Sequence, residues 1–382
     1  MDMIDENLIR ITAVQSVGPL PDPFRMDDGQ IAATPALWER RRLELYRTAV
    51  ELQFGTQPPE PEFLTAEPLD NGSRVQSIRI TTGPRNHPVT FLMRVFYPAE
   101  PGKHPVVVDG DLCWAYHFDK AFLSALTDQN IIFVTFNREE LAPDRFESGR
   151  SGPLYQAYPD RTFGAVGAWA WGFSRCVDAL EQLDIGDRSL IAFCGHSRGG
   201  KAALLAGALD TRAAIVNPNC AGGGGSGCYR IHMTGITEDG REMRDETLKD
   251  LMRPETGFWF GPELGKYAGQ EETLPFDEHF LKALVAPRIL LETQAASDLW
   301  ANSVGTWQTA EAVREVYRFL GAPENMLLYY RRGVHFHDVA DVARLARIIN
   351  QKKQGLPFEE GSFRLPFRKT DLFFNWKRPN LR

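Results

Sequence analysis

The hydrophobic and polar positions of the first hundred residues change from a helical period to the alternation of strands. In residues 36–53, leucine and alanine recur at helical spacing, which predicts a helix that the segment PPEPEF ends. From about residue 74 the period is two, so RVQSIRITT and VTFLMRVFYP are expected to form antiparallel strands. The shorter HPVVVDG is mostly apolar, which is typical of a strand buried on both faces.

Beyond residue 130, apolar strands alternate with amphipathic helices. Residues 131–137 predict another strand, 164–184 a long helix, and 189–195 a strand that passes at once into the helix RGGKAALLAGALD. Three further strands are expected at AAIVNPN, RILLETQ and NMLLYYR, with helices before or between them. Strand and helix repeated in this way build a mainly parallel sheet with helices on both faces, so the predicted fold class is an α/β three-layer sandwich.

The domain organisation is expected to be simple. The chain shows no internal repeat, no low-complexity tract and no clear linker, which favours a single domain over residues 1–382. Residues 1–34 are rich in Pro, Asp and Gly and are expected to wrap the surface as an irregular N-terminal arm. Residues 229–285 are expected to be a long insertion near the functional site, and 350–382 a C-terminal tail.

Composition narrows the classes of partner. The 382 residues, 43% of them hydrophobic, are ample for a large core. A net charge of −7 argues against nucleic acid or anionic membrane as the main partner. No stretch approaches the ~18 to 20 apolar residues of a membrane span, and the N-terminus is acidic where a signal peptide would be basic. We therefore expect a soluble, cytoplasmic protein, and the sequence gives no handle on its oligomeric state.

The cysteines indicate neither a disulfide framework nor a zinc site. Their number is odd and no CxxC pair occurs, whereas a framework is even and dense and a zinc site has its own ligand spacing. A reducing compartment is the simpler interpretation, and we expect no metal and no cofactor. The five residues are Cys113, Cys176, Cys194, Cys220 and Cys228.

Residues 195–199 read Gly-His-Ser-Arg-Gly and match the Gly-x-Ser-x-Gly pattern of a nucleophile elbow. In that motif a strained turn between strand and helix lifts the serine hydroxyl above the sheet, and the flanking glycines avoid clashes. The pattern alone is weak, and the alternative is a tight turn with an incidental serine. Here it lies between the strand SLIAFC and the helix KAALLAGAL, as the elbow requires. The context favours Ser197 as the nucleophile of an α/β-hydrolase.

A serine nucleophile needs a base, and the base needs a group that orients it. In α/β-hydrolases the chain order is serine, acid, histidine. Asp298 follows the strand RILLETQ, where the next loop of the sheet would deliver an acid, and Glu292 is the alternative carboxylate. His335 follows the strand NMLLYYR and is favoured over His337 because it lies nearer the strand end. The predicted catalytic residues are therefore Ser197, His335 and Asp298.

The oxyanion of ester cleavage needs donors that are fixed before the reaction. The backbone N–H of Arg198 is one candidate and its guanidinium is another. Lys201 lies four residues after Ser197 and therefore on the same face of the helix. Its side chain either points into the mouth of the site or is an ordinary solvated side chain. The Gly-rich run 221–227 lacks the Lys-Ser/Thr of a phosphate loop and is expected to form a flexible wall beside the elbow.

Several blocks of the sequence resemble the glucuronoyl esterases, carbohydrate esterase family fifteen. That family carries Gly-Cys-Ser-Arg-x-Gly-Lys, and residues 195–201 read Gly-His-Ser-Arg-Gly-Gly-Lys. The likeness extends from about residue 36 to 345 and is more specific for the fold than for the activity. The other similar blocks are LWERRRLELYRTAVELQFGTQPPEPE, TFNREELAPD, AVGAWAWGFSRCVDALE, FWFGPELGKYAGQEETLPFDEHFLKALVAPR and SDLWAN.

The resemblance implies metal-free hydrolysis of the ester between a glucuronic acid carboxyl and an alcohol, as in lignin–glucuronoxylan linkages. Position by position, Ser197 matches the family's nucleophile, His335 its general base and Arg198 its oxyanion arginine. Three more residues match positions that contact the substrate: Lys201 a lysine that binds sugar hydroxyls, Trp300 a tryptophan that lines the pocket, and Glu246 a sugar-contacting glutamate.

Two positions depart from the family pattern. Many members carry their acid as a glutamate on the loop where Cys220 stands here, and a thiol cannot hold an imidazolium as a carboxylate does. Some members use an acid after the later strand, the place of Asp298. His196 replaces the cysteine before the nucleophile, so a disulfide to Cys228, the family's partner position, cannot form.

The sequence therefore predicts a serine carboxylic ester hydrolase whose partner is a small-molecule or oligosaccharide ester of glucuronic acid. One alternative keeps the fold but changes the substrate to an acetylated sugar, a lactone or a generic carboxylester. The other, motivated by Cys220, is a non-catalytic carbohydrate-binding protein on the same scaffold.

Overall fold

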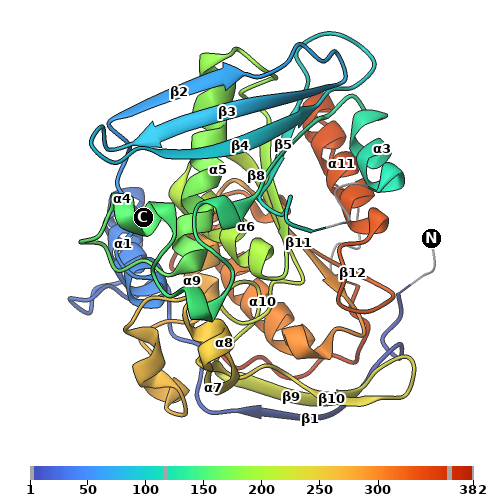
Figure 1. The fold of residues 1–382 in the computed structure, drawn as a ribbon. Coiled ribbons are helices and arrows are strands. Elements are labelled where there is room, and N and C mark those ends of the chain that lie inside the picture. The colour runs from blue at the N-terminus through green and yellow to red at the C-terminus, as the bar shows by residue number, and fades with distance from the viewer. Residues whose placement is uncertain (1–3, 115–118, 359–363, 381–382) are drawn as a thin grey trace.

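A nine-stranded, mostly parallel sheet is the centre of the computed structural model, which describes residues 4–114, 119–358 and 364–380 (Figure 1). Its strand order is β12-β11-β8-β7-β5-β6-β4-β3-β2. The strands from β12 to β6 are parallel, and β4, β3 and β2 add an antiparallel edge. Their bounds are β2 (Phe63–Pro68), β3 (Val75–Gly83), β4 (Val89–Phe96), β5 (Val106–Asp109), β6 (Ile132–Phe136), β7 (Ile191–His196), β8 (Ala213–Asn219), β11 (Ile289–Ala295) and β12 (Met326–Arg331).

Helices cover both faces of this sheet, so the predicted three-layer α/β sandwich is confirmed (Figure 1). On one face lie α3 (Lys120–Thr127) and α11 (Val339–Gln354), which pack against each other. The helices of the other face are α5 (Ala165–Gln182), α6 (Arg198–Leu209), α9 (Glu278–Val285) and α10 (Ser303–Phe319). The predicted helix 36–53 is α1 (Pro35–Tyr46), continued by a π-helical turn at Arg47–Glu51 and α2 (Leu52–Phe54).

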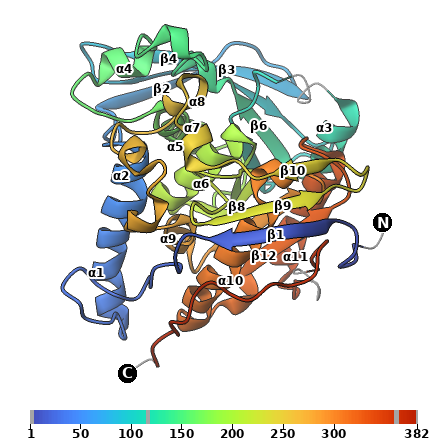
Figure 2. The ribbon, with the colours of Figure 1, turned by 90° about the horizontal axis from the view of Figure 1, so that it is seen from below.

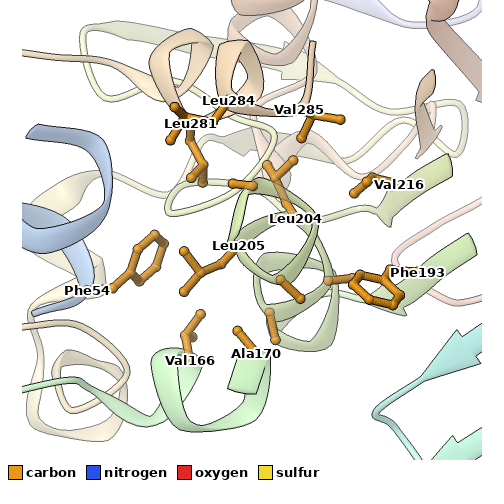
Figure 3. Close-up of a cluster of buried hydrophobic side chains, with 14 of the residues drawn as sticks. Phe54, Val166, Ala170, Phe193, Leu204, Leu205, Val216, Leu281, Leu284 and Val285 are labelled. Carbon is orange, nitrogen blue, oxygen red and sulfur yellow. The ribbon is translucent and has the colours of Figure 1, made fainter. Parts of the chain in front are cut away.

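Alternate residues of the buried strands supply two separate cores. Val106 and Val108 of β5 belong to the core beneath α5 and α6, whereas Val107 belongs to the core beneath α3 and α11. This alternation follows from the period of two in a strand, and it explains why β5 is apolar throughout. Figure 3 shows part of the larger core, where Leu204 and Leu205 of α6 meet side chains from several elements.

The N-terminal arm contains a strand, so the prediction of an irregular arm over 1–34 was wrong for part of it. β1 (Arg10–Ser16) pairs antiparallel with β9 (Ile231–Ile236), and β10 (Glu242–Arg244) pairs with the other edge of β9 (Figure 2). The strand forms because an edge more than 200 residues away supplies its hydrogen bonds, a partner that local composition cannot reveal.

Segments near the two ends of the chain pack together. The indole N–H of Trp376 donates to the carbonyl oxygen of Leu20 at 2.9 Å. Helix α11 ends only at Gln354, so the predicted tail 350–382 begins inside a helix rather than after it. Residues 1–3 of the predicted arm, and 359–363 and 381–382 of the predicted tail, lie outside the described residues.

The predicted insertion 229–285 contains β9, β10 and three α-helices (Figure 2). These helices are α9, α7 (Leu248–Leu251) and α8 (Pro254–Gly257). A further short helix, α4 (Pro153–Ala157), precedes α5. Among the described residues, no helix has both the length and the apolar character needed to cross a bilayer.

The topology fixes where a functional site can lie. Strands β7, β8, β11 and β12 are consecutive neighbours and parallel, so the loops after them leave the same edge of the sheet. In open α/β sheets this edge is where ligands bind. Ser197, Cys220, Asp298 and His335 all follow the ends of these four strands.

We expect Leu205→Ala to lower the free energy of unfolding by about 3 kcal/mol, because it leaves a cavity between α6 and its neighbours. Leu205 is fully buried, whereas Leu43 of α1 is 64% exposed and serves as the matched control. Urea denaturation measures both variants. Equal losses in Leu205→Ala and Leu43→Ala would contradict the packing described for α6.

Candidate active site

Ser197 lies in a strained turn between β7 and α6. Its backbone has φ 55° and ψ −122°, and its N–H donates to the carbonyl oxygen of Asn219 at 2.8 Å. The two glycines of the motif are needed for space. A Cβ on Gly195 would overlap the carbonyl oxygen of Gly199, and a Cβ on Gly199 would overlap the carboxylate of Asp111. The geometry is that of a nucleophile elbow.

Ser197, His335 and Asp298 form one chain of hydrogen bonds. His335 Nε2 lies 2.9 Å from Ser197 Oγ, and His335 Nδ1 lies 2.6 Å from Asp298 Oδ2. The carboxylate is buried, whereas the imidazole is 42% exposed and open to a substrate. In this arrangement Nδ1–H donates to the carboxylate and Nε2 accepts the serine proton, as proton transfer from the hydroxyl requires. The structure thus brings together the three residues predicted for catalysis.

The two alternative residues are engaged elsewhere. The ring of His337 packs edge-on against Phe122 with 5.1 Å between centroids, and its Nε2 lies 3.8 Å from the thiol of Cys194. Glu292 is fully buried in an ion pair with Lys282 at 2.8 Å. Neither side chain therefore replaces its favoured counterpart in the chain from Ser197.

Cys220 lies beside this chain of hydrogen bonds, but its thiol does not provide the acid. It occupies the turn after β8 with φ 44°, and its Sγ accepts the N–H of Ala295 at 3.3 Å. Burial raises the pKa of the thiol well above its ordinary value, so it carries no charge to offset an imidazolium. One ligand atom each of Cys220, Asp298 and His335 lie within 4.8 Å of one another, a grouping that would admit a metal ion. Two of those atoms already bond each other.

His196, the departure from the family pattern, adds a second imidazole next to His335. The two ring centroids are 4.6 Å apart, and His196 Nδ1 lies 2.6 Å from Asn219 Oδ1. Burial, with a smaller effect of His335, lowers the pKa of His196 to about 3, so its ring is neutral. The neutral ring of His196 therefore lies against the ring of His335, which is positioned to accept the serine proton. The five cysteines are free thiols, and the cytoplasmic location stays a prediction.

Arg198 places its guanidinium at the mouth of the site. Its Nη1 donates to Asp144 Oδ2 at 3.0 Å, and its Cζ lies 4.5 Å from the ring centroid of Trp259. Arg198 is also the first residue of α6, where backbone N–H groups without a helical partner favour negative charge. The backbone N–H of Arg198 thus lies next to Ser197, and Arg198 and Ser197 line the same cavity.

A cavity of about 760 Å³ opens beside the nucleophile and is mostly apolar. It has room for a group much larger than a methyl. Its lining residues are Trp114, Asp119, Phe122, His196, Ser197, Arg198, His335, Phe336, His337 and Val339.

Lys201 is buried and bound by the Gly-rich loop, not solvated. Its Nζ donates to the carbonyl oxygens of Ala221, at 2.6 Å, and Gly223. Residues 221–227 are all buried and wrap the lysine, and a Cβ at Gly224, where φ is +78°, would overlap the ring of Phe260. The expectation of a flexible wall was therefore wrong. The glycines serve close packing, because a Cβ at Gly224 or Gly225 would overlap Phe260 or Ala221.

Glu246 and Trp300 are neighbours, and the charge of Lys201 acts on the Glu246 carboxylate. The N–H of Glu246 donates to the carbonyl oxygen of Trp300 at 2.9 Å. Burial raises the pKa of Glu246, and the charge of Lys201 opposes that rise. The guanidinium of Arg244 lies 5.1 Å from the Trp300 ring centroid. The three predicted substrate-binding residues are thus neighbours, although none lines the 760 Å³ cavity.

Sequence reasoning missed two residues that contact the site, Asp144 and Trp259. Both lie inside blocks that resemble the family, TFNREELAPD and FWFGPELGK, but neither belongs to a catalytic motif. Their only signal was position within those blocks. Their contact with each other joins segments more than 100 residues apart, and each is more than 50 residues from Arg198.

Three comparisons with known proteins agree with this geometry. A sequence profile of the family described as "Glucuronyl esterase, fungi" matches residues 80–321. A protein of Podospora anserina, named 4-O-methyl-glucuronoyl methylesterase, is 32% identical over 80% of this chain and 61% of its own. One of the same name from Schizophyllum commune is 31% identical over 80% of this chain and 75% of its own. The chain thus spans less than two thirds of the Podospora protein.

A solved structure resembles the whole fold. It is a glucuronoyl esterase of carbohydrate esterase family 15 from Caldicellulosiruptor kristjansonii, with a TM-score of 0.82 and 27% identity. The match covers 94% of this chain and 97% of the other. The similarity therefore includes the sheet, the helical layers and the insertion that surrounds the site.

Glu278→Gln should make the protein more stable relative to the wild type as the pH rises. Burial and the neighbouring Asp277 raise the pKa of Glu278 from 4.5 to about 8. The folded protein therefore keeps a proton that the unfolded chain loses, and wild-type stability falls as the pH rises from 4.5 through 8. Glutamine has no such titration. Urea denaturation should show a relative gain of about 1 kcal/mol or more between pH 5 and 9.

The matched control is Glu255→Gln on the exposed surface of α8, which should track the wild type at every pH. Parallel stability curves for Glu278→Gln and the wild type would contradict the raised pKa.

Proposed function

Because this chain belongs to the glucuronoyl esterase family, we propose that it hydrolyses alkyl esters of glucuronic acid with Ser197 as the nucleophile. The observation that carries the proposal is the continuous chain of hydrogen bonds from Ser197 Oγ through His335 to Asp298 at the elbow. Such a chain is what a serine hydroxyl needs to attack an ester carbonyl near neutral pH. The names of the fungal relatives supply the class of substrate.

The reaction proceeds in two halves. Ser197 Oγ attacks the ester carbonyl while His335 Nε2 takes the hydroxyl proton and Asp298 stabilises the resulting imidazolium. The tetrahedral oxyanion lies at the start of α6, next to the backbone N–H and guanidinium of Arg198. His335 then gives the proton to the departing alcohol. Water then enters, its oxygen attacks the acyl carbonyl, and His335 Nε2 takes one of its protons. The bond between the carbonyl carbon and Ser197 Oγ breaks, His335 returns the proton to Ser197 Oγ, and the free acid leaves.

The sugar of the acid half is held by Lys201, Glu246 and Trp300. Glu246 offers carboxylate oxygens to sugar hydroxyls, and Trp300 offers a ring face. The charge of Lys201 is fixed behind them by two carbonyl oxygens. The alcohol half occupies the cavity lined by Trp114, Phe336 and their neighbours.

The binding-only alternative rested on Cys220, which cannot act as the acid. Asp298 supplies a buried carboxylate 2.6 Å from His335, so the motivation for that alternative is gone. The other alternative keeps the hydrolase fold but changes the ester that is cleaved. Rates of turnover on different esters decide between it and the proposed substrate.

Asp298→Asn should lower kcat by roughly 10⁴-fold, as in the serine protease example of the same change. An amide cannot stabilise the imidazolium and favours the wrong tautomer of His335. Initial rates of alcohol release from methyl or benzyl glucuronate measure the effect. A loss smaller than about tenfold would show that another carboxylate serves His335.

Purified protein should release alcohol from benzyl and methyl glucuronate, and Glu246→Gln should lower kcat/KM for these esters by about tenfold. The loss corresponds to weakening a hydrogen bond to a charged group, worth about 1.5 kcal/mol or more. The same variant should cleave p-nitrophenyl acetate nearly as fast as the wild type, because that ester has no sugar. Glu255→Gln, on the exposed surface of α8, is the control for both substrates.

Cleavage of simple acyl esters without any turnover of glucuronate esters would reject the substrate but keep the serine hydrolase. Equal losses of Glu246→Gln on both substrates would instead remove Glu246 from sugar recognition.

A further inference from the structure

Asp144 holds two groups of the active-site mouth with its two oxygens. Oδ2 accepts from Arg198 Nη1 at 3.0 Å, and Oδ1 accepts from the indole N–H of Trp259 at 3.0 Å. The Trp259 ring in turn lies under the guanidinium, 4.5 Å from Arg198 Cζ. The guanidinium is thus held between a carboxylate and an aromatic face, which themselves bond each other.

This arrangement is built into the fold and is not a surface ion pair. The Asp144 side chain is 7% exposed, against 35% for Arg198. The three residues come from different parts of the chain: the loop between β6 and α5, the start of α6, and the insertion after α8. Burial of the acceptor and a planar stack beneath the donor favour one position of the guanidinium.

Arg138 anchors Asp144 from below. It is fully buried, and its Nη2 donates to Asp144 Oδ2 at 3.4 Å. Its Cζ lies 4.4 Å from the ring centroid of Trp114 and 4.9 Å from that of Trp169. Its Nη1 forms an ion pair with Asp111. The position of Asp144 is therefore fixed by buried neighbours and does not depend on solvent.

The network ends on the backbone beside the nucleophile. Asp111 Oδ2 accepts the N–H of His196 at 2.8 Å, and the same carboxylate fills the space that a Cβ on Gly199 would need. The groups that shape the turn at Ser197 and those that hold the Arg198 side chain are thus connected through Arg138.

We propose that Asp144 is a positioning residue for the oxyanion guanidinium of Arg198. This proposal rests on the proposed function, since it takes Arg198 to stabilise the oxyanion. An arginine at a solvent-exposed mouth would otherwise sample many rotamers and would have to be ordered in each turnover. A donor contributes most to catalysis when its position is set before charge develops. Asp144 and Trp259 set it.

A structural role alone predicts a different behaviour. If Asp144 served only to neutralise Arg138, its replacement would disturb the site whether or not position 198 carries a guanidinium. If Asp144 acts through Arg198, its replacement has no effect once that guanidinium is gone. A double-mutant cycle separates these cases.

The experiment measures the rate constant for labelling of Ser197 by a fluorophosphonate, whose phosphoryl oxygen needs the same oxyanion donors. Arg198→Ala should slow labelling by 10²- to 10³-fold, the range found for loss of one oxyanion donor. Asp144→Asn, which keeps the shape but loses the charge, should slow it by roughly 10- to 100-fold. The double variant should label at the rate of Arg198→Ala. Trp259→Phe, which keeps an aromatic ring but loses the N–H donor, should fall between the wild type and Asp144→Asn.

Asp210→Asn is the matched control. Asp210 has an 8% exposed side chain bonded to Arg212, and it caps the far end of α6 from Ser197. It should label at the wild-type rate with a comparable change in melting temperature. The proposal is overturned if Asp144→Asn slows labelling by the same factor with and without Arg198, or by less than threefold.

Labelling by a fluorophosphonate does not require a uronate substrate. The proposal on the substrate and the proposal on Asp144 can therefore fail independently. If Ser197 shows the predicted coupling between positions 144 and 198 while glucuronate esters are not cleaved, the substrate proposal fails and the role of Asp144 stands. If glucuronate esters are cleaved and no coupling is seen, Asp144 has no positioning role and the esterase remains.

Discussion

The backbone turn at Ser197 is the constraint on which the rest of the site depends. A non-glycine residue at positive φ costs roughly 1–3 kcal/mol and persists only where its surroundings hold it. Here the N–H of Ser197 is bound by Asn219 and that of His196 by Asp111, so both sides of the turn are fixed. The hydroxyl is thereby presented at the edge of the sheet where the later loops converge, and the positions of base, acid and oxyanion donors follow from it.

The pairing of β8 and β11 explains why Asp298 can take the place that a carboxylate at position 220 would have. Asn219 and Thr293 are partners in this parallel pair, and the N–H of Cys220 donates to the carbonyl oxygen of Thr293 at 2.9 Å. Because the two strands end side by side, a carboxylate from either loop reaches the same imidazole. A buried, uncharged thiol then leaves Asp298 as the acid, and the neutral ring of His196 adds no competing positive charge beside His335.

Local patterns predicted the strands, the elbow, and the order of serine, acid and base. Each is a short stretch whose meaning depends on its own neighbours, such as Ser197 between an apolar strand and an alanine-rich helix. What the sequence could not reveal depends on distant partners. β1 needs the edge of β9, and the Gly-rich loop is held by partners that include the ammonium of Lys201 and the hydroxyl of Thr309. From their composition these segments were expected to be irregular or flexible. Composition contains no information on what a segment packs against.

Buried charge in the site bears on which ester it accepts. Lys201 is 3% exposed, and burial lowers its pKa while Glu246 opposes that shift, so the two groups compensate each other away from bulk water. Leaving a buried polar group without a hydrogen-bond partner costs more free energy than forming one such hydrogen bond gains. An apolar acyl chain over Glu246 would leave its carboxylate without a hydrogen-bond donor, whereas the hydroxyls of a sugar ring would donate to it. The preference proposed above, for a uronate ester over a fatty or simple acyl ester, would follow from this penalty on the wrong substrate.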